Sequence, residues 1–386
     1  MVEHVQALLH QLVAFPTVSR TSNLELLDWL SDQVETLGGR VRAIKSTHTD
    51  RANIVATIGP ETPGGLLLSG HTDVVPPGEG WDSDPWTLTR RGDGFVARGA
   101  ADMKGFFAAV LHAMKDIDVA QLVAPVHLLA SYDEEIGCQG VRDVLAFLAA
   151  DPVVRPEIIV IGEPTMMRPR HSHLGKELYR LIVTTPEAHS SRAAITPSAI
   201  AAAAELICVL SQVQASAPLG PEVDVPPYSV NCGTVHGGTA ANIVAGVCTV
   251  DFEVRHDVSN DPAELLSPFF SALAEVDARL RVVGGHAVCE LLTRYPALKS
   301  ELSSSAFARA VQIADAGPST ALGFGTEGGL LASVFDAPIM ICGPGDIADA
   351  HRPNELVSEH QLERCVYFVR ELVREFCLRN STQSKR

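Results

Sequence analysis

The stretch LLLSGHTDVVPPGEGW, residues Leu66–Trp81, decides the fold. Three leucines lead through a serine and a glycine to His71 and Asp73. A short continuous apolar run is typical of a strand that is buried on both faces of a parallel sheet. Polar residues directly after such a strand point to a function, because ligands of open α/β sheets bind at the carboxyl ends of the strands.

Other short apolar runs repeat this pattern along the chain. They are Asn53–Ile58, Val126–Ser131, Ile158–Ile161 and Ile339–Cys342. Between several of them lie helical patterns such as MKGFFAAVLHAMKD and GVRDVLAFLAAD. Strands that alternate with helices predict an α/β fold, with a mostly parallel sheet covered by helices on both faces.

The middle of the chain has a different pattern. Half-alternating segments such as ELYRLIVTT and CTVDFEVRHD are interspersed with two helical patterns, PSAIAAAAELICVLSQVQ and PAELLSPFFSALAEVDARL. This combination predicts an inserted α+β domain with an open antiparallel sheet over residues 174–281. Residues 1–173 and 282–386 would then form one discontinuous α/β domain.

Composition narrows the classes of partner. A chain of 386 residues, 46% of them apolar, can bury two domain-sized cores. The formal charge of −16 disfavours nucleic acid and anionic membranes as partners. The first residues lack the basic and apolar regions of a signal peptide. The eight cysteines are scattered without a C-x-x-C pair, which favours the reducing cytoplasm.

Several predicted strands lead to acids and histidines. Together with an aspartate that opens a predicted helix, these residues are His71, Asp73, Asp102, Glu134, Glu135, Glu163 and His351. Each motif alone is ordinary: H-x-D is a weak signal, and paired glutamates often open a helix. Because the carboxyl ends of parallel strands share one edge of the sheet, we expect the set to converge there.

Clustered carboxylates repel one another and become protonated unless a cation neutralises them. Two imidazoles with three carboxylates suit two zinc-like divalent ions, each with one imidazole, one terminal carboxylate and a share of a bridging one. Asp73 is predicted to accept the second ring N–H of His71 and so to orient that histidine. The predicted strand of the opening stretch therefore ends in candidate metal ligands.

Five motifs together carry a resemblance to a known family. They read SGHTDVVP, RGAADMKGF, SYDEEIGCQGVRDVL, IGEPT and AHRPNEL. The chain resembles, over essentially its whole length, the acetylornithine deacetylase and succinyl-diaminopimelate desuccinylase family of dinuclear zinc hydrolases. The resemblance implies a zinc aminopeptidase-like catalytic domain, with the insert serving as a lid and dimerisation domain.

The resemblance also implies the roles of the clustered residues. One ion would be held by His71 and Glu163, the other by Glu135 and His351, with Asp102 bridging both. Glu134 would be the general base, which takes a proton from water and returns it to the leaving amine. The ions would be zinc, with cobalt as an alternative, and the Asp102–Met103 peptide bond would be cis.

The inserted domain would complete the site. By resemblance, His189 of PEAHSS reaches from the partner subunit of a homodimer and hydrogen-bonds the oxyanion of the reaction. Asn242 and Arg255, with Gly325 and Thr326 of FGTEGGL, would bind the α-carboxylate of the substrate. The segment that follows His189 departs from the family pattern, so the acyl-group preference is the least defined property.

The resemblance implies hydrolysis of the amide bond of an N-acyl amino acid. Within the family, the pattern is nearest to the members that convert N2-acetyl-L-ornithine to L-ornithine and acetate in arginine biosynthesis. The alternatives are another N-acyl amino acid, or a dipeptidase or carboxypeptidase reaction. A homologue that binds amino acids without hydrolysing them is disfavoured, because all five ligand positions and Glu134 are present.

Overall fold

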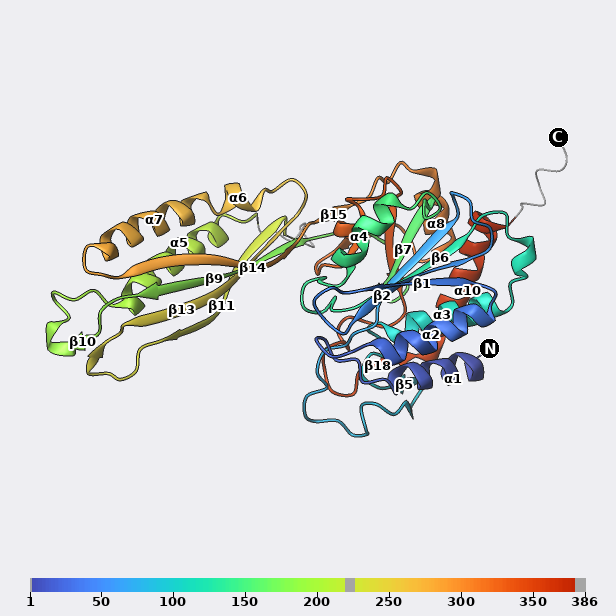
Figure 1. Ribbon diagram of the computed structural model, residues 1–386, viewed down its shortest axis with the longest axis horizontal. Coiled ribbons are helices and arrows are strands. Elements are labelled where there is room, and N and C mark those ends of the chain that lie inside the picture. The colour runs from blue at the N-terminus through green and yellow to red at the C-terminus, as the bar shows by residue number, and fades with distance from the viewer. Residues whose placement is uncertain (1, 219–225, 379–386) are drawn as a thin grey trace. The chain divides into compact units, whose positions relative to one another are not determined.

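The computed structural model describes residues 2–218 and 226–378, which form two compact units (Figure 1). Unit 1 comprises residues 1–172, 299–321 and 326–386, and unit 2 comprises residues 173–298 and 322–325, in each case as far as the chain is described. Among the described residues, no helix combines the length and apolar character needed to cross a membrane.

The centre of unit 1 is a sheet in which four neighbouring strands run parallel. In spatial order they are β6 (Val126–Ser131), β3 (Leu66–His71), β7 (Ile158–Pro164) and β17 (Ile339–Gly343). Every residue of these strands is buried, which explains their continuous apolar runs. The prediction of an α/β fold with a mostly parallel sheet is confirmed.

Shorter or antiparallel strands complete this nine-stranded sheet. They are β1 (Arg40–Lys45), β2 (Ala52–Ile58), β8 (Arg170–His173), β15 (Leu298–Lys299) and β16 (Thr320–Leu322). Antiparallel pairing joins β1 to β2, β2 to β6 and β17 to β8. A separate three-stranded sheet contains β4 (Thr89–Arg91), β5 (Gly94–Val96) and β18 (Leu356–Ser358).

Helices cover both faces of the large sheet. The larger core contains side chains from α1 (Val2–Val13), α2 (Leu24–Thr36), α3 (Lys104–Lys115), α8 (Ser305–Ala314) and α10 (Glu359–Cys377). The helices α4 (Val141–Ala150) and α9 (Gly328–Leu331) pack together outside that core. Successive strand residues point to opposite faces, so Leu66 and Leu68 enter the larger core. Ser69 and His71 therefore lie on the face of Leu67.

Unit 2 is an open antiparallel sheet covered by two helices on one face. Its strands, in spatial order, are β11 (Tyr228–Gly237), β13 (Val247–His256), β9 (Gly175–Thr184) and β14 (His286–Tyr295). The helices α5 (Ala199–Ala215) and α7 (Ser267–Arg281) run along it (Figure 1). Alternate residues of β13 are buried, among them Phe252, which packs against Phe269 of α7.

Several short elements complete the two units. In unit 1, η1 (Val119–Gln121) is a single 3₁₀ turn. In unit 2, β10 (Ala188–His189) pairs with β12 (Ile243–Val244), and η2 (Ser190–Arg192) and α6 (Pro262–Leu265) are single turns.

The second unit extends further along the chain than the expected end at Arg281. Unit 2 runs to Leu298, because β14 pairs antiparallel with β9. The alternation of β14 is broken by a register shift between Leu291 and Thr293, and Leu292 is exposed. A strand whose alternation of buried and exposed residues is interrupted cannot be recognised from that alternation. The predicted end of the inserted domain was therefore placed too early.

Candidate metal centre

The structure brings together five acids and histidines from distant parts of the sequence. His71 ends β3 and Glu163 lies near the end of β7. Asp102 precedes α3, Glu135 follows β6, and His351 lies between β17 and β18. These residues form two groups that share Asp102, and within each group one ligand atom per residue lies within 4.8 Å of the others. The convergence at the strand ends is the one expected for a parallel sheet.

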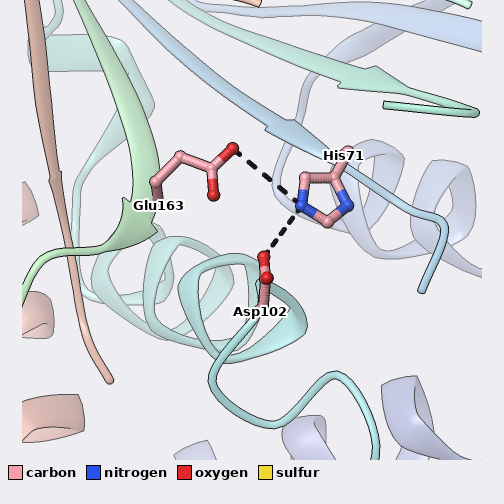
Figure 2. Close-up of side chains that lie close together, drawn as sticks. All are labelled: His71, Asp102 and Glu163. Carbon is pink, nitrogen blue, oxygen red and sulfur yellow. Dashed lines mark hydrogen bonds and ion pairs between the residues drawn. The ribbon is translucent and has the colours of Figure 1, made fainter. Parts of the chain in front are cut away.

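The first group contains His71, Asp102 and Glu163, all buried (Figure 2). His71 Nε2 lies 3.0 Å from Asp102 Oδ1 and 4.0 Å from Glu163 Oε1. Figure 2 shows the ring nitrogen facing both carboxylates. The three side chains therefore present one nitrogen and two oxygens to the same small volume.

The second group contains Asp102, Glu135 and His351. His351 Nε2 lies 2.9 Å from Glu135 Oε2 and 3.3 Å from Asp102 Oδ2. The side chain of His351 is 50% exposed, and its backbone adopts the left-handed conformation, with φ of 60°. Asp102 thus turns one oxygen toward each histidine, which is the arrangement of a bridging carboxylate. The Asp102–Met103 peptide bond is cis, as predicted.

The electrostatics of this cluster fit a divalent-ion site. Burial and Asp102 together raise the pKa of Glu163 well above its usual range and that of Glu135 to about 7. Hydrogen bonds with Asp102 and Glu135 raise the pKa of His351 to about 10. Without a cation, protons must balance the crowded carboxylates. Two divalent ions would balance them instead, and imidazole nitrogens with carboxylate oxygens are donors that zinc accepts.

Glu134 lies beside the cluster but belongs to neither group of candidate ligands. Its Oε1 accepts a hydrogen bond from Cys138 Sγ at 3.2 Å. Burial, followed by the charges of Glu135 and Asp73, raises the pKa of Glu134 to about 8. A carboxylate with a raised pKa next to the ligands, and not among them, can accept and return a proton.

The predicted role of Asp73 is corrected by the structure. The ring nitrogen His71 Nδ1 pairs with the backbone oxygen of Asp73 at 2.8 Å, whereas Asp73 Oδ1 lies 3.7 Å away. The carboxylate instead accepts hydrogen bonds from Glu134 N at 3.0 Å and from Ser19 Oγ at 2.7 Å. Asp73 therefore orients His71 through its backbone, and its side chain fixes the segment that carries the two glutamates.

Unit 2 brings two of the expected substrate residues together. His189 and Ile243 are opposite one another where β10 pairs with β12, and Ser190 N donates to Asn242 O at 2.9 Å. The side chains of His189 and Asn242 are exposed. His189 Nδ1 accepts a hydrogen bond from Ser191 N at 3.2 Å, so the ring is oriented locally.

Arg255 and Gly325 both lie next to Tyr295 of unit 2. The guanidinium of Arg255 hydrogen-bonds Tyr295 and pairs with Glu253 Oε1 at 2.9 Å. A Cβ atom at Gly325 would lie 2.1 Å from Tyr295 Cε2, so only glycine fits there. Thr326, by contrast, belongs to unit 1, where it is fully buried and its Oγ1 accepts a hydrogen bond from Gly328 N.

Sequence reasoning missed two residues that support the candidate ligands. Ser19 reaches the carboxylate of Asp73, and Glu327 accepts hydrogen bonds from Ser69 and Ser131, which lie on neighbouring strands. Glu327 is buried, and its only signal in the sequence was an acid between Thr326 and two glycines. Ser19 had no signal, because it lies 54 residues from Asp73 along the chain.

Comparisons with known proteins define the class. The family model described as peptidase family M20/M25/M40 matches residues 67–375. Acetylornithine deacetylase from Proteus mirabilis is 32% identical over 382 residues, 96% of each chain. The fold is similar to that of an M20 family metallo-carboxypeptidase from Sulfolobus solfataricus, with a TM-score of 0.79 and 18% identity over 96% of this chain and 98% of that one.

A third comparison concerns a Bacillus subtilis protein described as a dinuclear metal-binding peptidase of the M20 family. It has a TM-score of 0.68 and 16% identity, over 96% of this chain and 97% of that one. Fold and site together define a metal-dependent hydrolase. The chain belongs to peptidase family M20/M25/M40.

Proposed function

We propose that this chain is a dinuclear zinc amidohydrolase that converts N2-acetyl-L-ornithine to L-ornithine and acetate. The observation that carries the hydrolytic part is the position of Asp102, whose two oxygens face His71 Nε2 and His351 Nε2 at 3.0 and 3.3 Å. The relatives named acetylornithine deacetylase, about 30% identical over nearly the whole chain, support the substrate.

The five candidate ligands would hold the two ions. His71 and Glu163 would bind one, Glu135 and His351 the other, and Asp102 both. Bound ions would polarise the amide carbonyl and lower the pKa of a water molecule. Glu134 would accept the proton of the attacking water and deliver it to the leaving amine. Contacts with His351 occupy Glu135, which leaves Glu134 as the residue for proton transfer.

Residues of unit 2 would bind and orient the substrate. His189 is exposed and can donate a ring N–H to a developing oxyanion, because its Nδ1 is already an acceptor for Ser191 N. Arg255 would pair with the α-carboxylate of the amino acid, assisted by Asn242, Gly325 and Thr326. L-Ornithine as the product would place the reaction in arginine biosynthesis.

The test is a substrate panel under metal control. Purified protein, stripped of metal and reloaded with Zn²⁺ or Co²⁺, is expected to release acetate from N2-acetyl-L-ornithine faster than from other N-acetyl amino acids. Dipeptides and N-acylated peptides in the same panel test the dipeptidase and carboxypeptidase alternatives. Absence of acetate release from every N-acyl amino acid would contradict the proposal.

The proposal includes a homodimer formed through unit 2. β11 is an edge strand of ten residues that carries no lysine, arginine, aspartate, glutamate or proline, and Val235 on it is exposed. The opposite edge, β14, carries Glu290 and Arg294. Charges and prolines normally protect edge strands from pairing, so the bare β11 is suited to pair with the same strand of a second copy.

Sedimentation at several protein concentrations tests the dimer. Replacement of Val235 by lysine is expected to shift the protein toward the monomer, whereas the same replacement of Val288 on β14, which is also exposed, should not. A monomeric wild-type protein would contradict this part of the proposal.

The proposed location is the cytoplasm. All eight cysteines lie among the described residues, and none of them forms a disulfide, which supports a reducing compartment.

A further inference from the structure

A second buried carboxylate, Glu355, contacts the segment that carries Asp102. Glu355 Oε1 accepts hydrogen bonds from Ala101 N at 2.8 Å and from Asp102 N at 2.9 Å. Glu355 Oε2 accepts from Gly99 N at 2.9 Å and from Arg98 Nη1 at 2.6 Å. One carboxylate thus binds both ends of the segment that precedes the bridging aspartate.

The register of the small sheet places Glu355 there. β18 pairs antiparallel with β5, with Leu356 opposite Val96, and Ala97 N donates to Glu355 O at 3.2 Å. Glu355 directly precedes β18, so its side chain lies beside the turn that follows β5. The contact is therefore set by sheet pairing, which gives it a fixed geometry.

Glu355 is also linked to the other histidine of the site. It follows His351 by four residues, in the same connection between β17 and β18. One side chain therefore joins the segment that presents Asp102 to the segment that presents His351. These are two of the three residues in the second group of candidate ligands.

The charge of Glu355 is compensated without any metal ion. Glu355 is 1% exposed and Arg98 is 1% exposed, and the two form a buried ion pair. Arg98 Nη2 also donates to Pro77 O at 3.3 Å, and the guanidinium lies 5.2 Å from the ring centre of Trp81. Four donors occupy the two oxygens of Glu355, so the carboxylate is engaged by the protein and is not free to bind an ion, even though burial and the charge of Asp102 raise its pKa.

We infer that Glu355, held by Arg98, is a positioning residue that fixes Asp102 and His351 relative to one another for metal binding. This inference rests on the metal centre of the proposed function but not on its substrate. Residues that orient ligands without touching the metal typically change its affinity by about 10–100-fold when they are replaced.

The test compares two matched variants in a metal titration of the apoprotein. Glu355→Gln keeps the size of the side chain, but its amide group turns a donor toward N–H groups that need an acceptor. The control is Asp151→Asn, because Asp151 is also buried and accepts from two backbone N–H groups, Val153 N and Val154 N, and from an arginine, Arg42. Asp151 directly follows α4, and these bonds reach no segment that carries a candidate ligand.

The inference predicts that Glu355→Gln binds Zn²⁺ or Co²⁺ about 10–100-fold more weakly than the wild type. Asp151→Asn should bind the ions as the wild type does, even where both variants lose similar thermal stability. If Glu355→Gln yields no folded protein, Glu355→Asp is the alternative. Aspartate keeps the charge, but its shorter side chain moves the carboxylate away from the Asp102 segment, so metal affinity should fall in the same way.

Three results would overturn the inference. They are wild-type metal affinity in the folded Glu355 variant, an equal loss of affinity in Asp151→Asn, and a wild-type protein that binds no divalent ion. The last would also remove the proposed metal centre. A wild-type protein that binds two ions but releases no acetate would contradict only the proposed substrate, and the metal titration would still decide the role of Glu355.

Discussion

The candidate ligands of unit 1 and the candidate substrate residues of unit 2 are built in opposite ways. His71, Asp102 and Glu163 are at most 5% exposed, and each contacts another member of the cluster. His189 and Asn242 are exposed and lie on or beside a pair of two-residue strands. These three buried ligands have their geometry before any substrate is present, whereas His189 and Asn242 present their side chains to solvent.

This difference separates two kinds of function. Buried ligands held at strand ends are suited to bind ions that stay with the protein. Exposed residues on short elements are suited to contact a substrate that enters and leaves. Changes in unit 1 should therefore alter metal binding or the chemical step, and changes in unit 2 should leave the ions in place.

Removal of the metal ions should have the largest effect. A chelator is expected to abolish turnover and to lower the stability of unit 1 alone, because all five proposed ligands belong to unit 1. At free ion concentrations about 100 times Kd, each ion contributes roughly 2.7 kcal/mol. Hydrogen exchange resolved by segment measures this: protection should fall in β3, β7 and the Asp102 segment, with β9 and β13 of unit 2 as the internal control. An equal loss of protection in both units would contradict the expectation that the ions stabilise unit 1 alone.

Replacement of Glu134 by glutamine should lower kcat by about 10³-fold, within the range of general acid–base catalysis. Both ions should remain bound, because Glu134 is outside both ligand groups. Steady-state kinetics with metal analysis checks this. Glu61→Gln, an exposed glutamate paired with Arg40, is the control and should be fully active. Turnover retained in Glu134→Gln would mean that another group is the base.

Replacement of His189 by alanine should lower kcat by about 10²-fold, the usual loss for one oxyanion donor. Metal content should not change, since the residue belongs to unit 2. The control is His286→Ala, an exposed histidine at the start of β14. A drop in bound metal for His189→Ala would show that a substrate residue of unit 2 also affects metal binding, so that the two functions are not divided between the units.

Replacement of Arg255 by lysine should raise KM about 10-fold with little change in kcat, because lysine keeps the charge but loses the planar fork for a carboxylate. Arg180→Lys is the matched control: Arg180 is on β9 of the same sheet and pairs with Asp251 at 2.7 Å. An equal rise in KM for both variants would point to a general effect of the sheet, and no rise in either would remove Arg255 from the substrate site.

Much of unit 1 could be predicted from local pattern. The apolar runs of β3, β6, β7 and β17 were recognisable because both faces of these strands are buried. The convergence of ligands followed from the rule that parallel strands share one carboxyl edge. β14 was missed, since a bulge and exposed apolar residues broke its alternation.

Side-chain direction could not be predicted in the same way. The spacing of His71 and Asp73 suggested a contact between ring and carboxylate, but the backbone oxygen of Asp73 occupies that position. The carboxylate instead accepts hydrogen bonds from Ser19 Oγ and Glu134 N, and Ser19 lies far away in the sequence. A short motif predicts which groups lie near one another, but it does not predict which of their atoms form the hydrogen bond.

The sequence by itself determined the parallel sheet, the kinds of side chain at its carboxyl edge and the need for cations among them. Periodicity carries this information, because it reports which residues of a segment are buried. The resemblance already implied that Asp102 bridges and that Glu135 rather than Glu134 pairs with His351, whereas only the tertiary structure supplied the distances between these side chains and showed that Glu355 joins their segments. Distances between segments far apart in sequence depend on strand register and packing, which no local pattern records.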